Sequence, residues 1–594
     1  MARHATSTNK AKPPKSKDVW GTIKRIWVYL SEKKALISLV LFLVLISVVL
    51  SLLGPYLIGF AFDEYIETRN SEGLLKLLVF LSLIYIVNSI AIWLYNYLMI
   101  SIAQNTVYRM RRHLFRHLHR LPISYFDRKQ HGELMSRLTN DMENVSRTLN
   151  SSVIQVFSSV LTLFGTVAFM IYLSPLFTLI TLTIIPLLYF GMKWITTRTR
   201  KYFREQQRNL GDMNGYIEET ISGQSVVKTF SQEEKVIKQF MERNERLKNS
   251  GYYAQAYSGF IPKLMNVLNN LSFTIIAFAG GILALNGLVS IGIIVTFTQF
   301  SRQFTRPLND LANQYNTLLS AVAGAERVFE VIDEEKETDQ DNAIELQDVK
   351  GDVEFSHVSF SYEKSGQTIH DVSFKAKVGE TVALVGPTGA GKTTIINLLS
   401  RFYDPDQGII TIDGRDMMSI TRESLRQHLG FVLQDPYLFE GTIRENIRYG
   451  KLEATDEEVI KAANFANAHS FIVKLPKGYD TVLSQDGAGI SQGQKQLLSI
   501  ARAILSRPKI LILDEATSSI DTITEIKIQE ALTRLMAGRT SFVIAHRLNT
   551  IQQADQILVL NEGEILEKGT HNSLMKNKGF YYELYHGHLK NDAI

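Results

Sequence analysis

A glycine-rich segment between a predicted strand and a predicted helix has the clearest chemistry in the sequence. Residues 381–385 are apolar and rich in β-branched side chains, as in a buried strand, and residues 395–402 have the apolar spacing of a helix. The segment between them matches G-x-x-x-x-G-K-[ST], in which glycines let backbone N–H groups surround a phosphate at a helix N-terminus. Lys392 can reach the β- and γ-phosphates, and the Thr393 hydroxyl can ligate Mg²⁺. The predicted phosphate-binding residues are Gly386, Pro387, Thr388, Gly389, Ala390, Gly391, Lys392, Thr393 and Thr394.

Other predicted strands end in residues that suit hydrolysis of a nucleoside triphosphate. One apolar run ends in Asp514, which suits the Mg²⁺ shell, and Glu515, which is placed to polarise an attacking water. Another ends in His546, which can contact the γ-phosphate. Gln434 follows a third run and can sense metal and water, while Tyr362 can stack an adenine base. The alternative interpretations are a helix cap for the two acids and a structural role for the histidine.

Length and composition limit the class of protein. A chain of 594 residues is too long for one hydrophobic core, so two or more domains are expected. The net charge of +5 is modest and gives no argument for a nucleic-acid partner. The absence of cysteine excludes disulfides, thiolate metal sites and a cysteine nucleophile. The polar, lysine-rich N-terminus has no apolar core, so we expect no removable signal peptide.

The first half of the chain is apolar in long blocks that are typical of membrane spans. A helix needs about 20 apolar residues to cross a bilayer, and we predict six spans. They are residues 35–62, 74–103, 153–173, 176–195, 265–285 and 288–304. A short amphipathic helix over residues 20–30 is expected to lie in the membrane interface.

The connections between the spans predict their orientation. The connections after the second and fourth spans are rich in arginine, whereas the loop after the first span is acidic. Because basic loops lie inside, both termini and both long connections are expected in the cytoplasm of a multi-pass protein of the cell membrane. Each long connection has about 50 to 70 residues, far more than a loop needs. The spans are therefore predicted to continue as helices into the cytoplasm, with short helices near residues 125–134 and 218–230 that dock on another domain or form ordinary turns.

The resulting fold class is an α-helical membrane domain of six transmembrane helices followed by an α/β P-loop NTPase domain. We predict a flexible cytoplasmic tail (1–18), a transmembrane domain (19–330), a linker (331–348) and a nucleotide-binding domain (349–594). Residues 333–341 of the linker are acidic and are expected to be solvated.

The motifs of the second half together resemble the ATP-binding cassette. They are Tyr362, Gly386–Thr394, Gln434, Ile490-Ser491-Gln492-Gly493-Gln494, Asp514-Glu515, Asp521 and His546. The six spans with long inner connections resemble a type IV (type I exporter) transmembrane domain. This resemblance covers nearly the whole chain and implies a half-transporter that acts as a dimer. In such a dimer each ATP–Mg²⁺ lies between one chain's phosphate loop and the partner's signature segment.

The resemblance also assigns the remaining site residues. The resemblance assigns cofactor binding to Ser491, Gln492, Gly493 and Gln494 of the signature and to Asp521, and metal binding to Thr393, Gln434 and Asp514. The short helices at the tips of the two long connections correspond to coupling helices, which transmit cassette closure to the spans.

Two departures from the family pattern are informative. The signature has Gln492 where the family pattern Leu-Ser-Gly-Gly-Gln has glycine, and Ser519-Ile520 stands where Ala-Leu is usual, while Glu515 and His546 are intact. This mixture resembles one chain of the bacterial heterodimeric multidrug exporters, in which one site is competent and the other degenerate. The competent site then uses this chain's Lys392, Asp514, Glu515 and His546, and the degenerate site uses its Gln492-containing signature.

The predicted function is ATP-driven export of amphipathic or lipophilic compounds. Aromatic residues are plentiful in the spans and ionisable ones few, which suits such substrates but also fits lipid-facing or packing positions. Expected partners are a homologous, non-identical half-transporter, a hydrophobic small molecule and membrane lipids. A homodimeric exporter of lipids and a nucleotide-gated channel are the alternatives, whereas short outer loops disfavour an importer and the spans exclude a soluble ATPase. Asp63 and Glu64 at the outer end of the first span are either interface residues or part of an outer gate.

Overall fold

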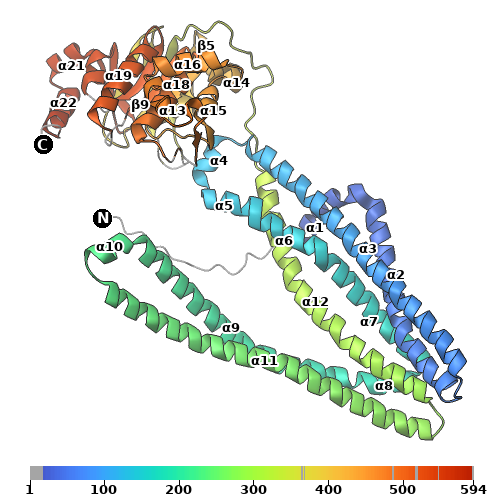
Figure 1. Cartoon of the computed structure of the whole chain (residues 1–594). Coiled ribbons are helices and arrows are strands. Elements are labelled where there is room, and N and C mark those ends of the chain that lie inside the picture. The colour runs from blue at the N-terminus through green and yellow to red at the C-terminus, as the bar shows by residue number, and fades with distance from the viewer. Residues whose placement is uncertain are drawn as a thin grey trace. The chain divides into compact units, whose positions relative to one another are not determined.

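Long helices dominate the first half of the computed structural model, which describes residues 18–362, 366, 368–484, 487, 489–515, 520–545 and 548–591 (Figure 1). The chain divides into two compact units. Residues up to 119 together with 131–334 form a helical unit, and residues 120–130 together with those from 335 onward form an α/β unit. The predicted N-terminal tail lies outside the described residues up to residue 17.

The helices of the helical unit extend well beyond their apolar stretches. They are α1 (Val19–Leu30), α2 (Lys34–Ala61), α3 (Ser71–Leu118), α5 (His131–Ser136), α6 (Met142–Arg147), α7 (Val153–Leu173), α8 (Pro175–Leu182), α9 (Ile184–Ser222), α10 (Gln224–Thr229), α11 (Glu233–Leu285) and α12 (Ile291–Ile332). Short π-helical turns at Phe62–Ile66, Arg137–Asp141 and Thr148–Ser152 and a 3₁₀ turn at Ser31–Lys33 connect some of them. At 1.5 Å per residue the 48-residue α3 is about 70 Å long. The prediction that the spans continue as helices is therefore confirmed.

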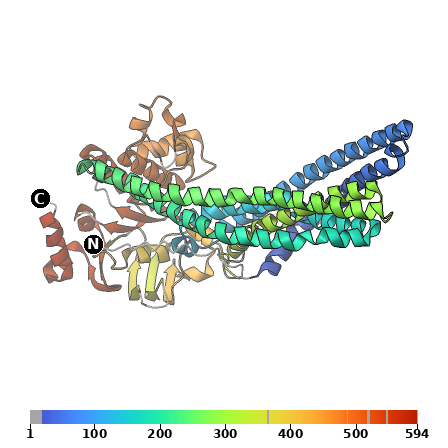
Figure 2. The ribbon, with the colours of Figure 1, turned by 90° about the horizontal axis from the view of Figure 1, so that it is seen from below.

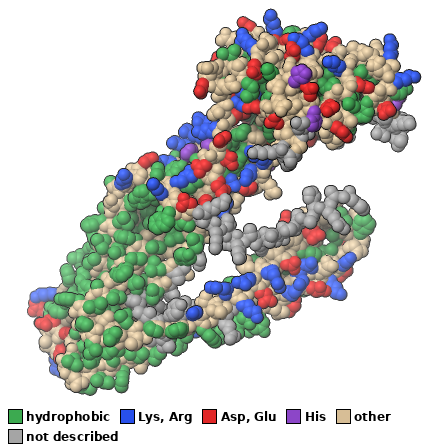
Figure 3. All heavy atoms as spheres, turned by 180° about the vertical axis from the view of Figure 1, so that it is seen from behind, with side chains coloured by type: hydrophobic (Ala, Val, Ile, Leu, Met, Phe, Trp, Pro, Cys, Tyr) green, Lys and Arg blue, Asp and Glu red, His purple; other side chains and the backbone are tan. Residues whose placement is uncertain are grey.

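Among the described residues, four helical segments are long and apolar enough to cross a membrane. They are Val19–Ile66, Ser71–Leu118, His131–Leu173 and Asn266–Leu285, of which the first three contain the predicted first, second and third spans and the fourth covers all but one residue of the fifth. The predicted fourth and sixth spans lie in α8 with the start of α9 and in the start of α12. Their crossing of the membrane stays a prediction. Large apolar side chains are exposed along α3, and Figure 3 shows hydrophobic side chains gathered on one face of the helical unit.

Helices α2 and α12 approach each other closely at the end of α2. A Cβ atom on Gly59 would lie 2.4 Å from the Gly292 carbonyl oxygen, so glycine is required there. The Asp63 carboxylate accepts hydrogen bonds from the Gly292 N–H at 2.6 Å and from the Ser290 hydroxyl at 2.5 Å. Asp63 thus satisfies donors at the N-terminus of α12.

Helices α9 and α11 run side by side as a hairpin with α10 at its tip (Figures 1 and 2). The ring of Tyr202 in α9 stacks on Tyr253 and Tyr257 of α11, with centroids 5.5 and 4.9 Å apart. The second predicted tip helix therefore exists as α10, and the first corresponds to α4 (Ile123–Arg128), which belongs to the α/β unit.

The α/β unit contains two main sheets. Its strands are β1 (Val353–Phe360), β2 (Ile369–Ala376), β3 (Thr381–Val385), β4 (Gln407–Ile412), β5 (Arg415–Asp416), β6 (Leu429–Val432), β7 (Gly441–Thr442), β8 (Val482–Leu483), β9 (Ile510–Glu515), β10 (Thr540–Ala545), β11 (Gln556–Asn561) and β12 (Glu564–Gly569). The larger sheet has the order β12-β11-β3-β10-β9-β6, in which the five strands from β11 to β6 are parallel. The smaller sheet, β2-β1-β4-β5, is antiparallel, and β7 pairs with β8.

Helices cover the larger sheet, and their apolar faces close the core. They are α13 (Lys392–Leu399), α14 (Arg422–Gln427), α15 (Ile443–Arg448), α16 (Asp456–Phe465), α17 (His469–Ile472), α18 (Gln492–Ser506), α19 (Thr522–Met536), α20 (Leu548–Gln553), α21 (His571–Asn577) and α22 (Phe580–Asn591). Short 3₁₀ turns lie at Met417–Ser419 and Gly478–Asp480. Two buried clusters result, one of which includes Leu513, Val543 and Leu497 and the other Leu384, Ile395 and Phe542.

Most of the acidic linker is solvated, as we expected, because residues 333–341 are exposed except for the partly buried Glu337. Glu337 accepts hydrogen bonds from the Arg426 guanidinium at 2.7 and 3.0 Å, and Asp339 accepts one from Arg422 at 2.9 Å. Pairing with arginines of the α/β unit, which no short-range pattern in the sequence indicates, holds this part of the linker against the domain.

Candidate functional site

The glycine-rich loop occupies the turn from β3 into α13. Gly386, Gly389 and Gly391 have φ angles of 154°, 86° and 97°, a region that favours glycine. A Cβ atom on Gly386 would lie 2.1 Å from the Leu560 carbonyl oxygen. Gly391 supplies no side-chain cap to α13, so the N–H groups of its first turn remain available to an anion. This backbone fits a phosphate.

Lys392 begins α13 and is folded back on the loop. Its ammonium donates hydrogen bonds to the carbonyl oxygens of Gly386 at 2.7 Å and Pro387 at 2.8 Å. Burial lowers the pKa of Lys392 below 10.5, and the charge of Asp514 opposes this effect. A half-buried cation held by neutral carbonyls suits an anionic ligand, because a phosphate supplies the charge that burial disfavours.

The strand register brings the other predicted chemistry to the same edge of the sheet. Asp514 and Glu515 end β9 opposite Ile544 and Ala545, which end β10, and β10 in turn pairs in parallel with β3. The carboxyl ends of β3, β9 and β10 therefore lie together, as expected for a ligand site in a parallel sheet. The predicted His546 and the side chain of Glu515 lie outside what the structure describes.

Tyr362 lies in the loop that precedes β2 and is 42% exposed. Its hydroxyl accepts a hydrogen bond from the Asn397 amide of α13 at 2.9 Å, so the helix that starts at the phosphate loop also orients this ring. The rings of Phe360 and Tyr403 pack nearly perpendicular to the Tyr362 ring, and the centroid of each lies 4.9 Å from that of Tyr362. The exposed part of the ring is available for stacking.

The signature-like segment starts α18 as a capping box. The Ser491 hydroxyl accepts from the Gln494 N–H at 3.3 Å, and the Ser491 N–H donates to Gln494 Oε1 at 3.0 Å. A Cβ atom on Gly493 would lie 2.5 Å from Thr524 Cγ2, so the segment packs closely on α19. Asp521 caps α19 by accepting from the Thr524 N–H at 2.9 Å, and this hydrogen bond lowers the pKa of Asp521.

Gln492 and Gln496 connect the signature helix to the loop of the predicted metal sensor Gln434. The Gln492 amide donates to Asp435 Oδ1 at 3.2 Å, and the Gln496 amide donates to the Leu433 carbonyl oxygen at 3.3 Å. Gln434 itself is exposed and follows the end of β6. Sequence reasoning missed Asp435, Gln496 and Asn397, because only the folded sheet brings the loop after β6 beside α18.

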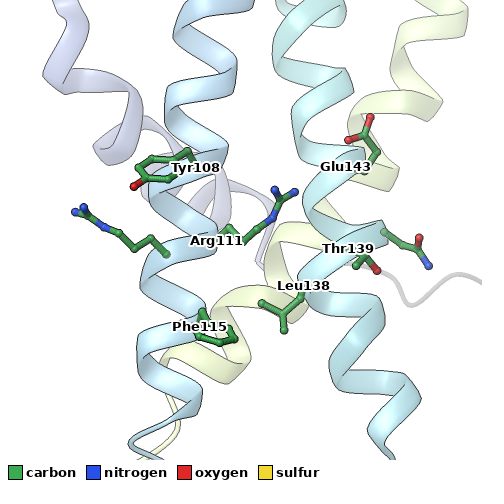
Figure 4. A pocket seen from close by; sticks show the side chains of 8 residues that line it. Tyr108, Arg111, Phe115, Leu138, Thr139 and Glu143 are labelled. Atoms are coloured by element: carbon green, nitrogen blue, oxygen red, sulfur yellow. The ribbon is translucent and has the colours of Figure 1, made fainter. Parts of the chain in front are cut away.

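A separate pocket lies wholly within the helical unit, between α3 and residues 138–143 (Figure 4). Its volume is about 750 Å³. The lining combines aromatic, polar and oppositely charged side chains, namely Tyr108, Arg111, Arg112, Phe115, Leu138, Thr139, Asn140 and Glu143. It has no glycine-rich backbone and carries none of the predicted site residues.

Comparison with known families and proteins agrees with this geometry. The model of the ABC transporter transmembrane region matches residues 37–308, and that of the ABC transporter domain matches residues 369–518. The chain is 61% identical to the uncharacterized ABC transporter ATP-binding protein YfiC of Bacillus subtilis, over 97% of this chain and 95% of the relative. It is 46% identical to a fatty acid ABC transporter ATP-binding/permease protein of Mycobacterium bovis, over 84% of this chain and 79% of the relative. It is 36% identical to an ATP-dependent lipid A-core flippase of Syntrophus aciditrophicus, over 91% of this chain and 90% of the relative.

Proposed function

Because the chain belongs to the ABC transporter family and is an ATP-hydrolysing transporter, we propose that it is one chain of a heterodimeric exporter of amphipathic or lipophilic compounds. Its relatives include a fatty acid transporter, a lipid A-core flippase and a putative multidrug exporter of Bacillus subtilis. These names support a lipophilic substrate class. We place the protein in the cell membrane with both termini in the cytoplasm, and a homologous half-transporter is its proposed partner.

The residues at the carboxyl edge of the larger sheet have different roles in ATP hydrolysis. The Gly386–Thr394 loop binds the phosphates through its backbone N–H groups, and Lys392 turns its ammonium from the loop carbonyls to the β- and γ-phosphates. Thr393, Asp514 and Gln434 would hold Mg²⁺, which supplies neutralisation of phosphate charge when bound. Glu515 accepts the proton of the attacking water, and His546 contacts the γ-phosphate. Tyr362 stacks the adenine.

The hydrogen bond from Gln492 to Asp435 of the same chain is the observation that supports a degenerate second site. In the dimer Ser491, Gln492, Gly493 and Gln494 face the partner's nucleotide, and Asp521 supports the junction. Gln492, where the family pattern has glycine, adds a side chain that is hydrogen-bonded to Asp435. This side chain occupies the surface that glycine leaves open for the nucleotide. The site built with this signature is therefore slow, and the site built on this chain's Lys392 and Glu515 turns over.

Purification alone and with the partner tests this assignment. We expect the chain alone in nanodiscs to bind ATP but hydrolyse it slowly, and to gain activity when the homologous half-transporter is co-expressed. Glu515→Gln should abolish the gained activity. Robust ATPase activity and transport by the chain alone would contradict the heterodimer and support a homodimeric lipid exporter. Single-channel currents gated by ATP in a planar bilayer would instead support a channel.

A further inference from the structure

The charged residues of the six predicted membrane spans all have the same sign. They are Lys76 in α3, Lys193 in α9 and Arg302 in α12, and the predicted spans contain no aspartate, glutamate or histidine. Arg306 follows the last predicted span by two residues. Because a charge in the hydrocarbon core is costly, such residues face a protein interior or a water-filled cavity and mark functional sites. Each of these cations therefore requires an explanation.

Lys76 has a counter-charge in its own helix, whereas Arg302 and Arg306 have none in the part of the chain that the structure describes. The Lys76 ammonium lies 2.6 Å from the Glu72 carboxylate, one turn away in α3. Arg302 and Arg306 are exposed, and neither forms an ion pair or a side-chain hydrogen bond with a described residue. The nearest carboxylate along α12 is Asp310, which accepts a hydrogen bond from the Gln155 amide at 2.7 Å instead.

The two arginines lie together on the exposed side of α12. Four positions separate them, so they are neighbours on one face, about 6 Å apart along the helix axis. Phe297, Phe300 and Pro307 form the buried side of the helix, at spacings of three and seven residues. Arg302 lies about 200° around the helix from Phe300. The pair thus points away from the side on which α12 is packed within the chain.

The depth of the pair excludes a simple explanation by lipid or by a second copy of this chain. Arg302 lies about 17 Å and Arg306 about 23 Å along α12 from its start at Ile291, compared with a hydrocarbon core of about 30 Å. Lipid tails cannot compensate these charges at such a depth. The spans of a second copy would add the same cations and no acid. A carboxylate or a phosphate fits the pair, because a guanidinium binds either group through two parallel hydrogen bonds.

We propose that Arg302 and Arg306 bind the head group of an anionic amphiphile, which is a long apolar chain ending in a carboxylate or a phosphate. The proposal rests on the export function proposed above and narrows its substrate class. The apolar and aromatic side chains of the spans suit the chain of such a compound, and the two guanidinium groups neutralise its head. A cationic amphiphile would meet two like charges and find no acid in the spans, so it is disfavoured.

The test measures the binding of amphiphiles that share one chain and differ in the head group, namely hexadecanoate, hexadecyl phosphate and hexadecyltrimethylammonium. The full chain is used with its partner half-transporter in nanodiscs of phosphatidylcholine, and empty nanodiscs give the background. We expect the tighter-binding anion, which identifies the head group, to bind at least about tenfold more tightly than the ammonium compound. Arg302→Gln and Arg306→Gln should each weaken anion binding about tenfold, because each removes hydrogen bonds to a charged group.

Two control variants separate a specific site from a general effect of charge. Lys76→Gln removes a cation that is already paired with Glu72 and should bind the anions like the wild type. Arg302→Lys keeps the positive charge and should retain most of the anion binding. A glutamine variant that has lost anion binding should still bind the ammonium compound at least as tightly as the wild type, whereas a misfolded variant would bind neither.

Three results would overturn the proposal. They are equal affinity of the wild type for the anions and the ammonium compound, anion binding that survives in both glutamine variants, and loss of the partner half-transporter from Arg302→Gln during purification. The last result would make Arg302 an interface residue. Selective anion binding without ATP-dependent transport would contradict the proposed export function alone, and transport that shows no preference for anions would contradict this proposal alone.

Discussion

The side-chain amide of Gln492 donates a hydrogen bond to the carboxylate of Asp435 at a distance of 3.2 Å. Gln492 lies in the signature segment and is the first residue of α18, and Asp435 is the neighbour of Gln434. The signature segment, proposed to face the partner's nucleotide, is thus tied within the chain to the loop proposed to sense its own nucleotide. The glycine of the family pattern has no side chain with which to form this tie.

Removing this hydrogen bond should activate the slow site. We expect Gln492→Gly to raise ATPase activity of the heterodimer by up to about fivefold, because a net hydrogen bond contributes about 1 kcal/mol. Steady-state phosphate release measures the change. Gln492→Ala serves as the matched variant, since it breaks the bond but keeps a Cβ atom, and unchanged activity in both variants would contradict a role for this tie.

Loss of the proposed general base should separate binding from hydrolysis. Glu515→Gln is expected to lower turnover at this chain's site by about 10²- to 10⁴-fold while ATP still binds, because only proton acceptance is lost. Trapped nucleotide and steady-state ATPase report the two properties. Glu525→Gln in α19 is the control, and preserved hydrolysis in Glu515→Gln at the competent site would refute the assignment.

The lowered pKa of Lys392 predicts a pH dependence of ATP binding. Burial favours the neutral amine in the nucleotide-free protein, whereas the phosphates favour the ammonium. Binding should therefore take up a proton, and affinity should fall as the pH rises through the lowered pKa of the free site. Lys392→Arg stays protonated and should show a flatter dependence over the same alkaline range, measured by fluorescent-nucleotide titration. Equal slopes for both proteins would exclude Lys392 as the titrating group.

The buried Arg401 should matter to the stability of the α/β unit. Arg401→Ala removes a buried side chain and its hydrogen bonds to the Ile420 carbonyl oxygen and Asp404, and it is expected to lower the free energy of unfolding by about 1–3 kcal/mol, because Arg422 still pairs with both carboxylates. Calorimetric unfolding of the full chain measures this loss. Arg415→Ala, at an exposed strand position, should change stability by less than about 0.5 kcal/mol.

The membrane topology can be tested directly, because the chain contains no cysteine. A single cysteine at Arg69 or Asn286 should react with an impermeant maleimide added outside intact cells, and one at Ser225 should react only after the cells are opened. Labelling at Ser225 from outside would contradict the predicted orientation.

Local sequence patterns were sufficient to predict the main helices and strands and many residues of the candidate site. The glycine loop, the strand that ends in Asp514 and Glu515 and the long helices follow from spacing and residue type, because each depends on neighbours along the chain. The length of the connection after the second span likewise indicates a helical tip near Asp127.

Tertiary structure alone decided which distant residues meet. The acidic linker is largely exposed, as expected, but its Glu337 and Asp339 also pair with arginines of α14. The bonds from Gln492 to Asp435 and from Tyr403 to Asp127 join residues 57 and 276 positions apart. Hydrogen bonds act over about 3 Å, so they depend on how the sheet and helices bring side chains together, and no periodicity along the chain encodes that.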